Sequence, residues 1–288
     1  MIVIKIAGGL GNQMFEYASA WALSKRLQQP LVLFVNEKEK DRPVRLTKLK
    51  LKVETILRPE QMPFAVKLLT NKQVKSLFRR LRKPNYQLED WLYFRQLNDR
   101  FQEKFFSIHA PNIFLEGYFQ CESYFRECRT ELVEQFTPSY EMEPICKQML
   151  VQIKSCNSVA VHVRRGDFQQ SSHRFHYLLT GDYYRRAMAY MKERLEDPQF
   201  FWFSEDFDWI QENFGNNNGF HFVKAKTANA DIDDIMLMKN CRHIITANSS
   251  FSWWGAWLNE HDDAIRIVPD KEFTTEGSIP ETWVKLPV

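Results

Sequence analysis

The sequence is poor in cysteine and has no pair of cysteines at metal-ligand spacing. It contains five cysteines, an odd number, and no C-x-x-C pair. Disulfide frameworks need an even set of cysteines, and structural zinc sites need close ligand pairs. Both classes are therefore excluded, and we expect reduced, mostly packed thiols in a reducing compartment.

A long apolar run is also missing. The N-terminal "MIVIKIAGGLGNQ" reaches glycine after a few apolar residues, which is too short for a signal peptide or a membrane span. The expected location is therefore the cytoplasm. The basic stretch 72–83 is typical of a solvated helix face, but it also fits an anionic membrane surface. The inner face of the membrane is thus a second expected location.

An excess of one charge is lacking too. The 39 basic and 36 acidic residues leave a net charge of +3, whereas nucleic-acid-binding domains carry a marked basic excess. We therefore expect no nucleic acid partner.

The length of 288 residues favours two domains, which we place at residues 1–150 and 151–288, with a linker-like segment at 137–144.

Short apolar runs alternate with helical patterns along both halves, which predicts an α/β fold with parallel sheets covered on both faces. Polar motifs follow three of the second-half strands: "HVRRGD" (162–167), "SED" (204–206) and "NSS" (248–250). The carboxyl ends of parallel strands meet at one edge, where ligands bind in open α/β sheets. The predicted strands are 2–7, 31–35, 112–119, 158–163, 200–204, 220–223, 243–247 and 265–268.

Two adjacent arginines, Arg164 and Arg165, end a buried strand. Arginines there are costly without an anion, and the guanidinium fork suits phosphate. The alternative is a structural ion pair with Asp167 or Glu205. His162, on the strand itself, fits a core histidine equally well.

The glycine-rich "GGLGNQMF" (8–15) follows a strand and opens a helix, so its backbone can approach a phosphate or a sugar. Gly9 and Gly11 fit the dinucleotide fingerprint G-x-G-x-x-G, but Met14 stands at its third glycine. Glu37 fits the ribose-binding acid of that fingerprint. A dehydrogenase is therefore a weakened interpretation that stays open.

The sequence holds two D-x-D patterns, Asp206-x-Asp208 and Asp231-x-Asp233, both near predicted helix starts. Acids are expected there as caps and from the helix dipole. Because two arginines can hold a leaving phosphate, we predict no metal site. Asp234, one turn into its helix, can instead direct a carboxylate at a nucleobase.

The tryptophans at 253, 254 and 257 have helical spacing, which predicts that at least two lie in the core.

Four segments together resemble the bacterial and animal α-1,2-fucosyltransferase family: "GGLGNQMF", "LEGYFQCESYF" (115–125), "HVRRGD" and "ITANSSFSWWGAWL" (244–257). The resemblance spans residues 3 to about 258. Two positions depart from the family pattern, Glu16 in place of glutamine and Phe168 in place of tyrosine.

This resemblance implies transfer of L-fucose from GDP-β-L-fucose to a galactose 2-hydroxyl, with inversion and with neither metal nor further cofactor. It implies a GT-B-like pair of Rossmann-type domains with parallel sheets facing a cleft. The C-terminal domain would hold GDP-fucose, and the N-terminal domain the β-galactoside acceptor, either free or lipid-linked. A catalytically silent nucleotide-sugar-binding protein on the same fold is the alternative.

The resemblance also implies residue roles. Arg164 would grip the β-phosphate of the leaving GDP, while His162 and Asp234 would contact guanine. Asn12 and Gln13 would face the reacting sugar. Asp167, Glu16 and His176 are candidates for the catalytic base, and a loose transition state can also proceed without a dedicated one. The full donor-binding set is Gly9, Gly11, Asn12, Gln13, His162, Arg165, Asp206, Asp234, Asn248, Ser249, Ser250 and Phe251.

Overall fold

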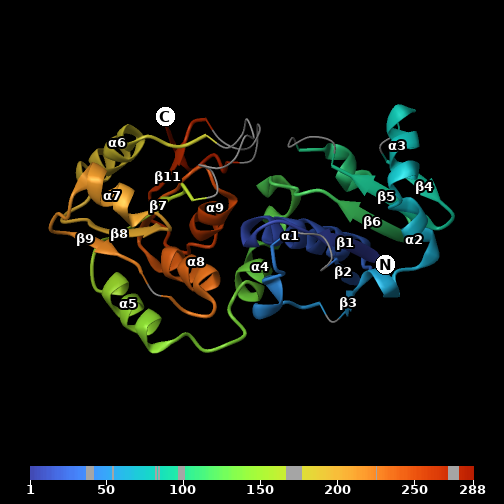
Figure 1. Cartoon of the computed structure of the whole chain (residues 1–288), viewed down its shortest axis with the longest axis horizontal. Coiled ribbons are helices and arrows are strands. Elements are labelled where there is room, and N and C mark those ends of the chain that lie inside the picture. Colours follow the sequence, from blue (N-terminus) through green and yellow to red (C-terminus); the bar gives the residue numbers. More distant parts are fainter. Residues whose placement is uncertain are drawn as a thin grey trace. The chain divides into compact units, whose positions relative to one another are not determined.

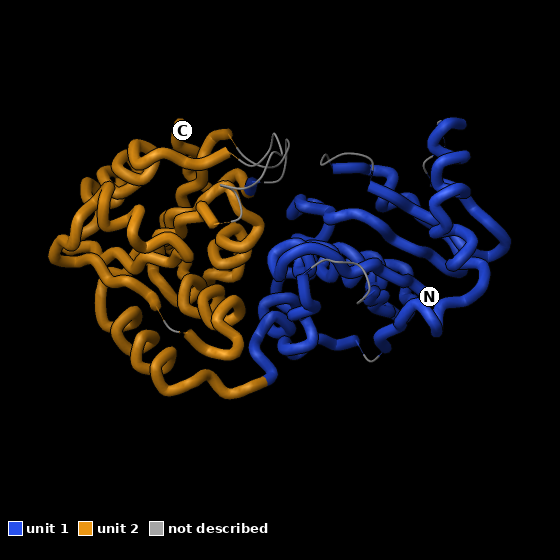
Figure 2. Tube along the Cα trace, in the orientation of Figure 1, with its two compact units in different colours: residues 1–139, 274–279 blue, residues 140–273, 280–288 orange. Residues whose placement is uncertain are grey.

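The computed structural model describes residues 1–36, 42–53, 55–81, 83, 85–96, 101–166, 177–224, 226–271 and 279–288. Strands and helices alternate along the chain (Figure 1), which divides into two compact units (Figure 2). The first unit comprises Met1–Ser139 and, of the later described residues, Ile279; the second comprises the other described residues from Tyr140 onward. The division lies inside the predicted linker 137–144. Helix α5 (Pro144–Lys154) packs on α8 (Ala230–Asn240) and belongs wholly to the second unit, whereas a boundary after residue 150 would divide it.

The first unit is built on a sheet whose central strand, β1, is buried at four of its five residues, all except Lys5. The strand order is β3-β2-β1-β6-β5-β4, and all neighbours are parallel except the antiparallel pair β4 and β5. Successive residues of a strand point to opposite faces, so the buried residues of β1 require cover on both sides. The strands are β1 (Ile2–Ile6), β2 (Leu31–Val35), β3 (Thr55–Leu57), β4 (Tyr86–Leu88), β5 (Trp91–Arg95) and β6 (Asn112–Glu116).

Helices supply that cover. Helix α1 (Leu10–Leu27) packs against β1 and β2. Helices α2 (Phe64–Leu69) and α3 (Lys72–Arg80) pack on the face that presents Val3, Val32 and Phe114. The predicted helical segment 121–136 forms two 3₁₀ turns, Glu122–Tyr124 and Arg126–Cys128, followed by α4 (Arg129–Gln135).

The second unit contains a six-stranded sheet in the order β12-β11-β10-β7-β8-β9, with every neighbouring pair parallel. Helices α6 (Gly181–Lys192) and α7 (Phe207–Phe214) bury residues against β7 and β8 in one core cluster. Two parallel-sheet α/β units confirm the predicted fold class. The strands are β7 (Ser158–Val163), β8 (Gln199–Ser204), β9 (Phe220–Phe222), β10 (His243–Ile245), β11 (Arg266–Pro269) and β12 (Val284–Leu286).

Helix α9 (Ser250–Trp257) carries the tryptophans, and all three are core residues, with exposed fractions of 2%, 0% and 3% for Trp253, Trp254 and Trp257. The prediction of a core role is confirmed. Helix α9 packs on α8 at Gly255, where an added Cβ would lie 3.0 Å from the Cβ of Met238. The two helices therefore approach each other backbone to backbone.

Candidate active site

Three polar segments come together at the carboxyl edge of the second sheet. Strand β7 lies between β10 and β8, so the chain after each strand emerges at the same edge. These segments are Arg164–Gly166 after β7, Glu205–Asp206 after β8, and Thr246–Ser249 after β10. The predicted convergence is thus present in the sheet topology.

Two buried tyrosines of α6 hold this edge in place. Tyr183 donates its hydroxyl to the carbonyl of Thr246 across 2.8 Å, and Tyr184 donates to the carbonyl of His162 across 3.2 Å. Both side chains are essentially inaccessible to solvent. The ends of β10 and β7 are therefore tied to the same helix, which gives any ligand there a preorganised backbone.

Arg165 is held by protein contacts. Its Nε donates to Oδ2 of Asp206 across 3.1 Å, and its guanidinium lies 4.4 Å from the centre of the Trp209 ring. Oδ1 of Asp206 caps α7 by accepting from the backbone N–H of Trp209. Arg165 and Asp206 were predicted to bind the donor. In the structure this pair joins the ends of β7 and β8, and donor binding by the two residues stays a prediction. The structural ion pair considered for the two arginines thus exists, with Asp206 as the partner.

His162 is buried beside Arg164. Burial, reinforced by the positive charge of Arg164, lowers the pKa of His162 to about 3. The imidazole is therefore neutral, and its ring centre lies 5.5 Å from that of Phe251. Its Nδ1 has no hydrogen-bond partner within the described residues, so a ligand can use it as a donor or acceptor.

The turn into α9 is bonded to itself. Oγ of Ser249 accepts from the N–H of Phe251 across 3.3 Å, and Oγ of Ser252 accepts from the N–H of Ala247 across 3.2 Å. Nδ2 of Asn248 donates to the carbonyl of Tyr177, while its buried Oδ1 lacks a partner among the described residues. The turn thus places the positive end of the α9 dipole at the sheet edge, where an anion is favoured.

Two adjacent acids of α8 have different surroundings. Asp233 is buried and accepts hydrogen bonds from the hydroxyls of Tyr140 and Thr227. Asp234 is half-buried, and its pKa is raised to about 7 by burial and by the negative charges of Asp233, Asp231 and Glu205. Its carboxyl group therefore changes charge near neutral pH. In the part of the chain that the structure describes, no three His, Cys, Asp or Glu residues group as metal ligands.

Glu205 belongs to this edge, although the sequence suggested it only as an ion-pair partner. The side chain is exposed, and its Oε2 approaches Gly166 so closely that a Cβ there would lie 2.3 Å away. Its charge also acts on Asp234. The sequence could have identified Glu205 by its position directly after β8. The neighbouring Asp206 is the better helix cap and drew the prediction instead.

In the first unit, the glycine loop is stabilised by two side chains that were predicted to act on substrate. Gln13 is completely buried: its Nε2 donates to the carbonyls of Gly8 and Pro43, and its Oε1 accepts from the N–H of Arg45. Glu16 is 2% exposed and accepts from the N–H of Ala7 across 2.9 Å. A buried amide and a buried carboxylate bonded to the backbone thus hold the loop, and the roles of facing the sugar and of catalytic base stay predictions.

Asn12 has a different environment. Its Oδ1 accepts from Nε2 of Gln120 across 2.8 Å, and the residue is half-buried. Gly8, with a φ of +73°, leaves room for the Asn12 amide, since a Cβ there would lie 2.7 Å from it. Because β1 and β6 are neighbours, the motif containing Asn12 and the motif containing Gln120 meet at one sheet edge.

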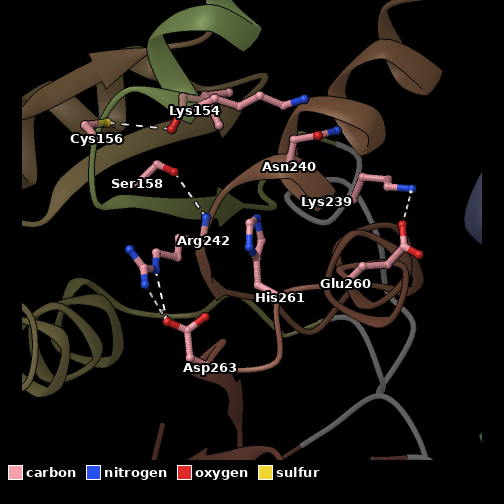
Figure 3. Close-up of a pocket in the computed structure, with 10 residues that line it drawn as sticks. Lys154, Cys156, Ser158, Lys239, Asn240, Arg242, Glu260, His261 and Asp263 are labelled. Carbon is pink, nitrogen blue, oxygen red and sulfur yellow. Dashed lines mark hydrogen bonds and ion pairs between the residues drawn. The ribbon is translucent and has the colours of Figure 1, made fainter.

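Two cavities lie at different ends of the sheets. A cavity of about 400 Å³ opens at the amino end of the second sheet, beside Ser158 and Arg242 (Figure 3). Arg242 pairs there with Asp263 at 2.7 Å and Lys239 with Glu260 at 3.4 Å, so these two cations are matched by carboxylates of the protein. A cavity of about 220 Å³ in the first unit lies near the carboxyl ends of β1, β2 and β6 and is lined by Lys5, Asn36, Lys75 and Glu116, among others.

Four residues considered in the sequence, Glu37, Asp167, Phe168 and His176, lie outside the described residues. Met14, which occupies the third position of the dinucleotide fingerprint, is 1% exposed within α1. A side chain packed there leaves no glycine for the close helix–strand contact of that fingerprint.

Comparison with known proteins gives consistent matches over the whole chain. A family model described as Glycosyl transferase family 11 matches residues 1–286. An alpha-1,2-colitosyltransferase of Escherichia coli is 32% identical over 99% of both chains. A galactoside alpha-(1,2)-fucosyltransferase 2 of Hylobates lar is 24% identical, covering 95% of this chain and 74% of the relative. The structure of an Arabidopsis thaliana FUT1 mutant in complex with GDP aligns with a TM-score of 0.52 at 11% identity, over 93% of this chain and 69% of the other.

Proposed function

Because this chain belongs to glycosyl transferase family 11, we propose that it transfers L-fucose from GDP-β-L-fucose to the 2-hydroxyl of a galactose in a glycan, with inversion at the anomeric carbon. The observation that carries the proposal is the meeting of Arg164, the N-terminus of α9 and the carboxyl group of Asp234 at one unit's sheet edge. Together they offer complementary groups to a diphosphate and to a guanine.

The diphosphate is the leaving group, and its charge grows as the bond to the sugar breaks. Arg164 supplies a guanidinium that can donate two parallel hydrogen bonds to phosphate oxygens. The turn at Ser249–Phe251 adds the helix dipole of α9. Donors fixed before the reaction stabilise such developing charge most effectively. These groups therefore perform the main catalytic task, and we propose that no metal or further cofactor takes part.

Guanine recognition is assigned to Asp234. An ionised carboxylate accepts hydrogen bonds from both N1–H and the exocyclic amine of guanine, whereas adenine presents an acceptor at N1. The elevated pKa of Asp234 means that GDP must displace its proton on binding below neutral pH. The neutral His162, with its available Nδ1, supplies a second polar contact to the nucleotide.

The acceptor is assigned to the first unit. Asn12 lies at the carboxyl edge of that sheet, and the 220 Å³ cavity beside Lys5 and Glu116 is polar enough for sugar hydroxyls. Because Glu16 is buried, the carboxylate proposed to take the acceptor proton is Asp167.

A second donor is favoured by the similarity to a colitosyltransferase. Colitose is L-fucose without its 3-hydroxyl group, so the two donors differ at one polar position. A site that hydrogen-bonds this hydroxyl rejects the deoxy sugar strongly, because the partner group is left unpaired. The ratio of kcat/KM for GDP-fucose and GDP-colitose therefore decides between the two sugars.

The proposal is tested by turnover on an array of β-galactosides. We expect GDP release with GDP-fucose and a product in which NMR shows an α-linked fucose on the galactose O2. Binding of GDP-fucose without product on any acceptor, with either donor sugar, would instead indicate the silent nucleotide-sugar-binding protein. A product linked elsewhere than O2 would refute the assigned regiochemistry while leaving the donor assignment intact.

A further inference from the structure

Helices α2 and α3 expose large apolar side chains. The exposed fractions are 80% for Phe64, 38% for Leu68, 55% for Leu77 and 57% for Leu81. Phe64 and Leu68 are four residues apart, as are Leu77 and Leu81. Residues at this spacing share one side of a helix, so each pair forms one outward apolar ridge. We call residues 64–83 the α2–α3 hairpin.

These outward residues are not the ones that hold the hairpin to its unit. Val66 and Leu69 of α2 are completely buried, and Val74 and Phe78 of α3 pack against the same core cluster. The ring of Phe78 stacks on that of Tyr86 at 3.9 Å. A surface helix normally pairs one apolar face with a polar one. Here both helices have a second apolar ridge that the fold does not use.

The charge around the ridges is strongly one-sided. Residues 61–88 contain seven of the 39 basic residues and none of the 36 acidic residues, so the rest of the chain carries a net charge of −4. The basic excess of the whole protein is therefore confined to the hairpin and its flanks.

The basic side chains of the hairpin are available to an external partner. Lys67, Lys72, Arg79, Arg80 and Lys83 are exposed, and in the described part of the chain no carboxylate forms an ion pair with any of the five. Lys75 differs, because it is bound to Glu116 across 2.5 Å. Asn71, which lies between the two helices (Figure 1), caps α3 by accepting from the N–H of Gln73.

We propose that the α2–α3 hairpin docks this protein on the surface of a membrane that contains anionic lipid. Apolar side chains enter the boundary between headgroups and acyl chains, while lysine and arginine beside them contact anionic headgroups. The attachment is peripheral, since no described helix is long and apolar enough to cross a bilayer. Lys67, Thr70 and Lys75 of the hairpin also line the cavity assigned to the acceptor, so the variants that test the inference are taken from hairpin residues outside that lining.

Vesicle sedimentation tests the proposal with the full chain. We expect binding to phosphatidylcholine vesicles containing a third phosphatidylglycerol, and weak binding to phosphatidylcholine alone. Each basic residue contributes about fivefold to such partitioning. Arg79→Ala/Arg80→Ala should therefore lower the partition coefficient roughly 25-fold, and Leu77→Ser/Leu81→Ser roughly tenfold.

Matched controls are Lys48→Ala/Lys50→Ala, which removes two exposed lysines of the same unit, and Ile145→Ser/Val151→Ser, which removes two exposed apolar residues of α5. Both controls should bind as the unaltered protein does.

Three outcomes overturn the proposal: no binding to anionic vesicles, equal binding by hairpin and control variants, or equal binding to neutral vesicles. If Leu77→Ser/Leu81→Ser instead abolishes a dimer seen by light scattering, the hairpin is an interface between copies of the chain, and the membrane assignment is wrong. Turnover of a soluble acceptor should be unchanged in the hairpin variants. A loss of vesicle binding with unchanged turnover thus separates this inference from the proposed catalytic function.

Discussion

Nε of Arg165 donates to Oδ2 of Asp206 across 3.1 Å, and this bond separates the roles of two adjacent arginines. The side chains of the pair are only 16% and 24% exposed. One arginine therefore holds the sheet edge together, and its neighbour is assigned to the diphosphate.

The two arginines should respond oppositely to alanine substitution. Arg164→Ala should lower turnover about 100-fold or more, because a charge-assisted donor to the leaving group is lost, while thermal stability stays near that of the unaltered protein. Arg164→Lys should restore turnover only in part, since an ammonium lacks the guanidinium fork. Arg165→Ala is the matched control and should destabilise the fold by about 2 kcal/mol, because Asp206 loses its partner. Steady-state kinetics and thermal melts measure both effects; a stable Arg165→Ala protein together with an unstable Arg164→Ala protein would reverse the assignment.

GDP affinity should rise with pH. The pKa of Asp234 is raised to about 7 in the folded protein, and only the ionised carboxylate accepts two hydrogen bonds from guanine. Calorimetry should therefore show GDP binding roughly tenfold tighter at pH 8 than at pH 6. Asp234→Asn should bind GDP weakly and lose most of this pH dependence. The phosphate groups of GDP also titrate in this pH range, but they do so with both proteins. The difference in pH dependence between the two proteins therefore reports Asp234 alone.

Asp234→Asn should also stabilise the fold at high pH. A carboxyl whose folded pKa lies above its unfolded value binds its proton more tightly in the folded state, so stability falls as pH rises from about 4 through 7. Asparagine removes the charge that burial opposes. We expect the free energy of unfolding to rise by about 2 kcal/mol at pH 8 and to change little at pH 4. Urea unfolding at the two pH values measures this, and equal effects at both would contradict the elevated pKa.

Gln13 and Asn12 are neighbours in sequence with different expected effects. Gln13→Ala should cost about 2–4 kcal/mol of stability, because the carbonyls of Gly8 and Pro43 and the N–H of Arg45 lose a completely buried partner. Asn12→Ala should cost about 1 kcal/mol or less and should reduce turnover instead. Denaturation and acceptor kinetics on the two variants distinguish a loop-holding residue from a substrate-facing one.

Activity should survive removal of divalent metal ions. Asp206 is engaged with Arg165 and with the cap of α7, and Asp233 accepts from two hydroxyls, so one acid of each D-x-D pattern already has protein partners. We expect unchanged turnover after exhaustive EDTA treatment. Activity that disappears and returns only with added Mg²⁺ or Mn²⁺ would show that arginine does not replace a metal here.

The buried parallel strands were predictable because runs such as "SVAVHV" are apolar on both faces, which few other structures require. Strands β3, β4, β5 and β12 were not predicted. Strands β3, β4 and β12 have three residues each, and β5 is aromatic without clean alternation, so no period is visible. Within the candidate site, the sequence predicted that three polar segments meet at one sheet edge, and the strand order confirms that meeting. It could not tell Arg164 from Arg165, nor show that Gln13 and Glu16 are buried, because both distinctions depend on which long-range partners the fold supplies.

The close contact between Gly255 and Met238 predicts the phenotype of a Gly255→Ala allele. The turn at Ser249–Phe251 begins α9, Asp234 lies on α8, and the two helices meet where an added Cβ would be 3.0 Å from the Cβ of Met238. Gly255→Ala would force the helices apart at a point that touches no substrate. Since such an overpacked core weakens a protein without abolishing its fold, this allele should be temperature-sensitive, functional in the cold and inactive on warming. Second-site suppressors should map to Met238 as smaller residues.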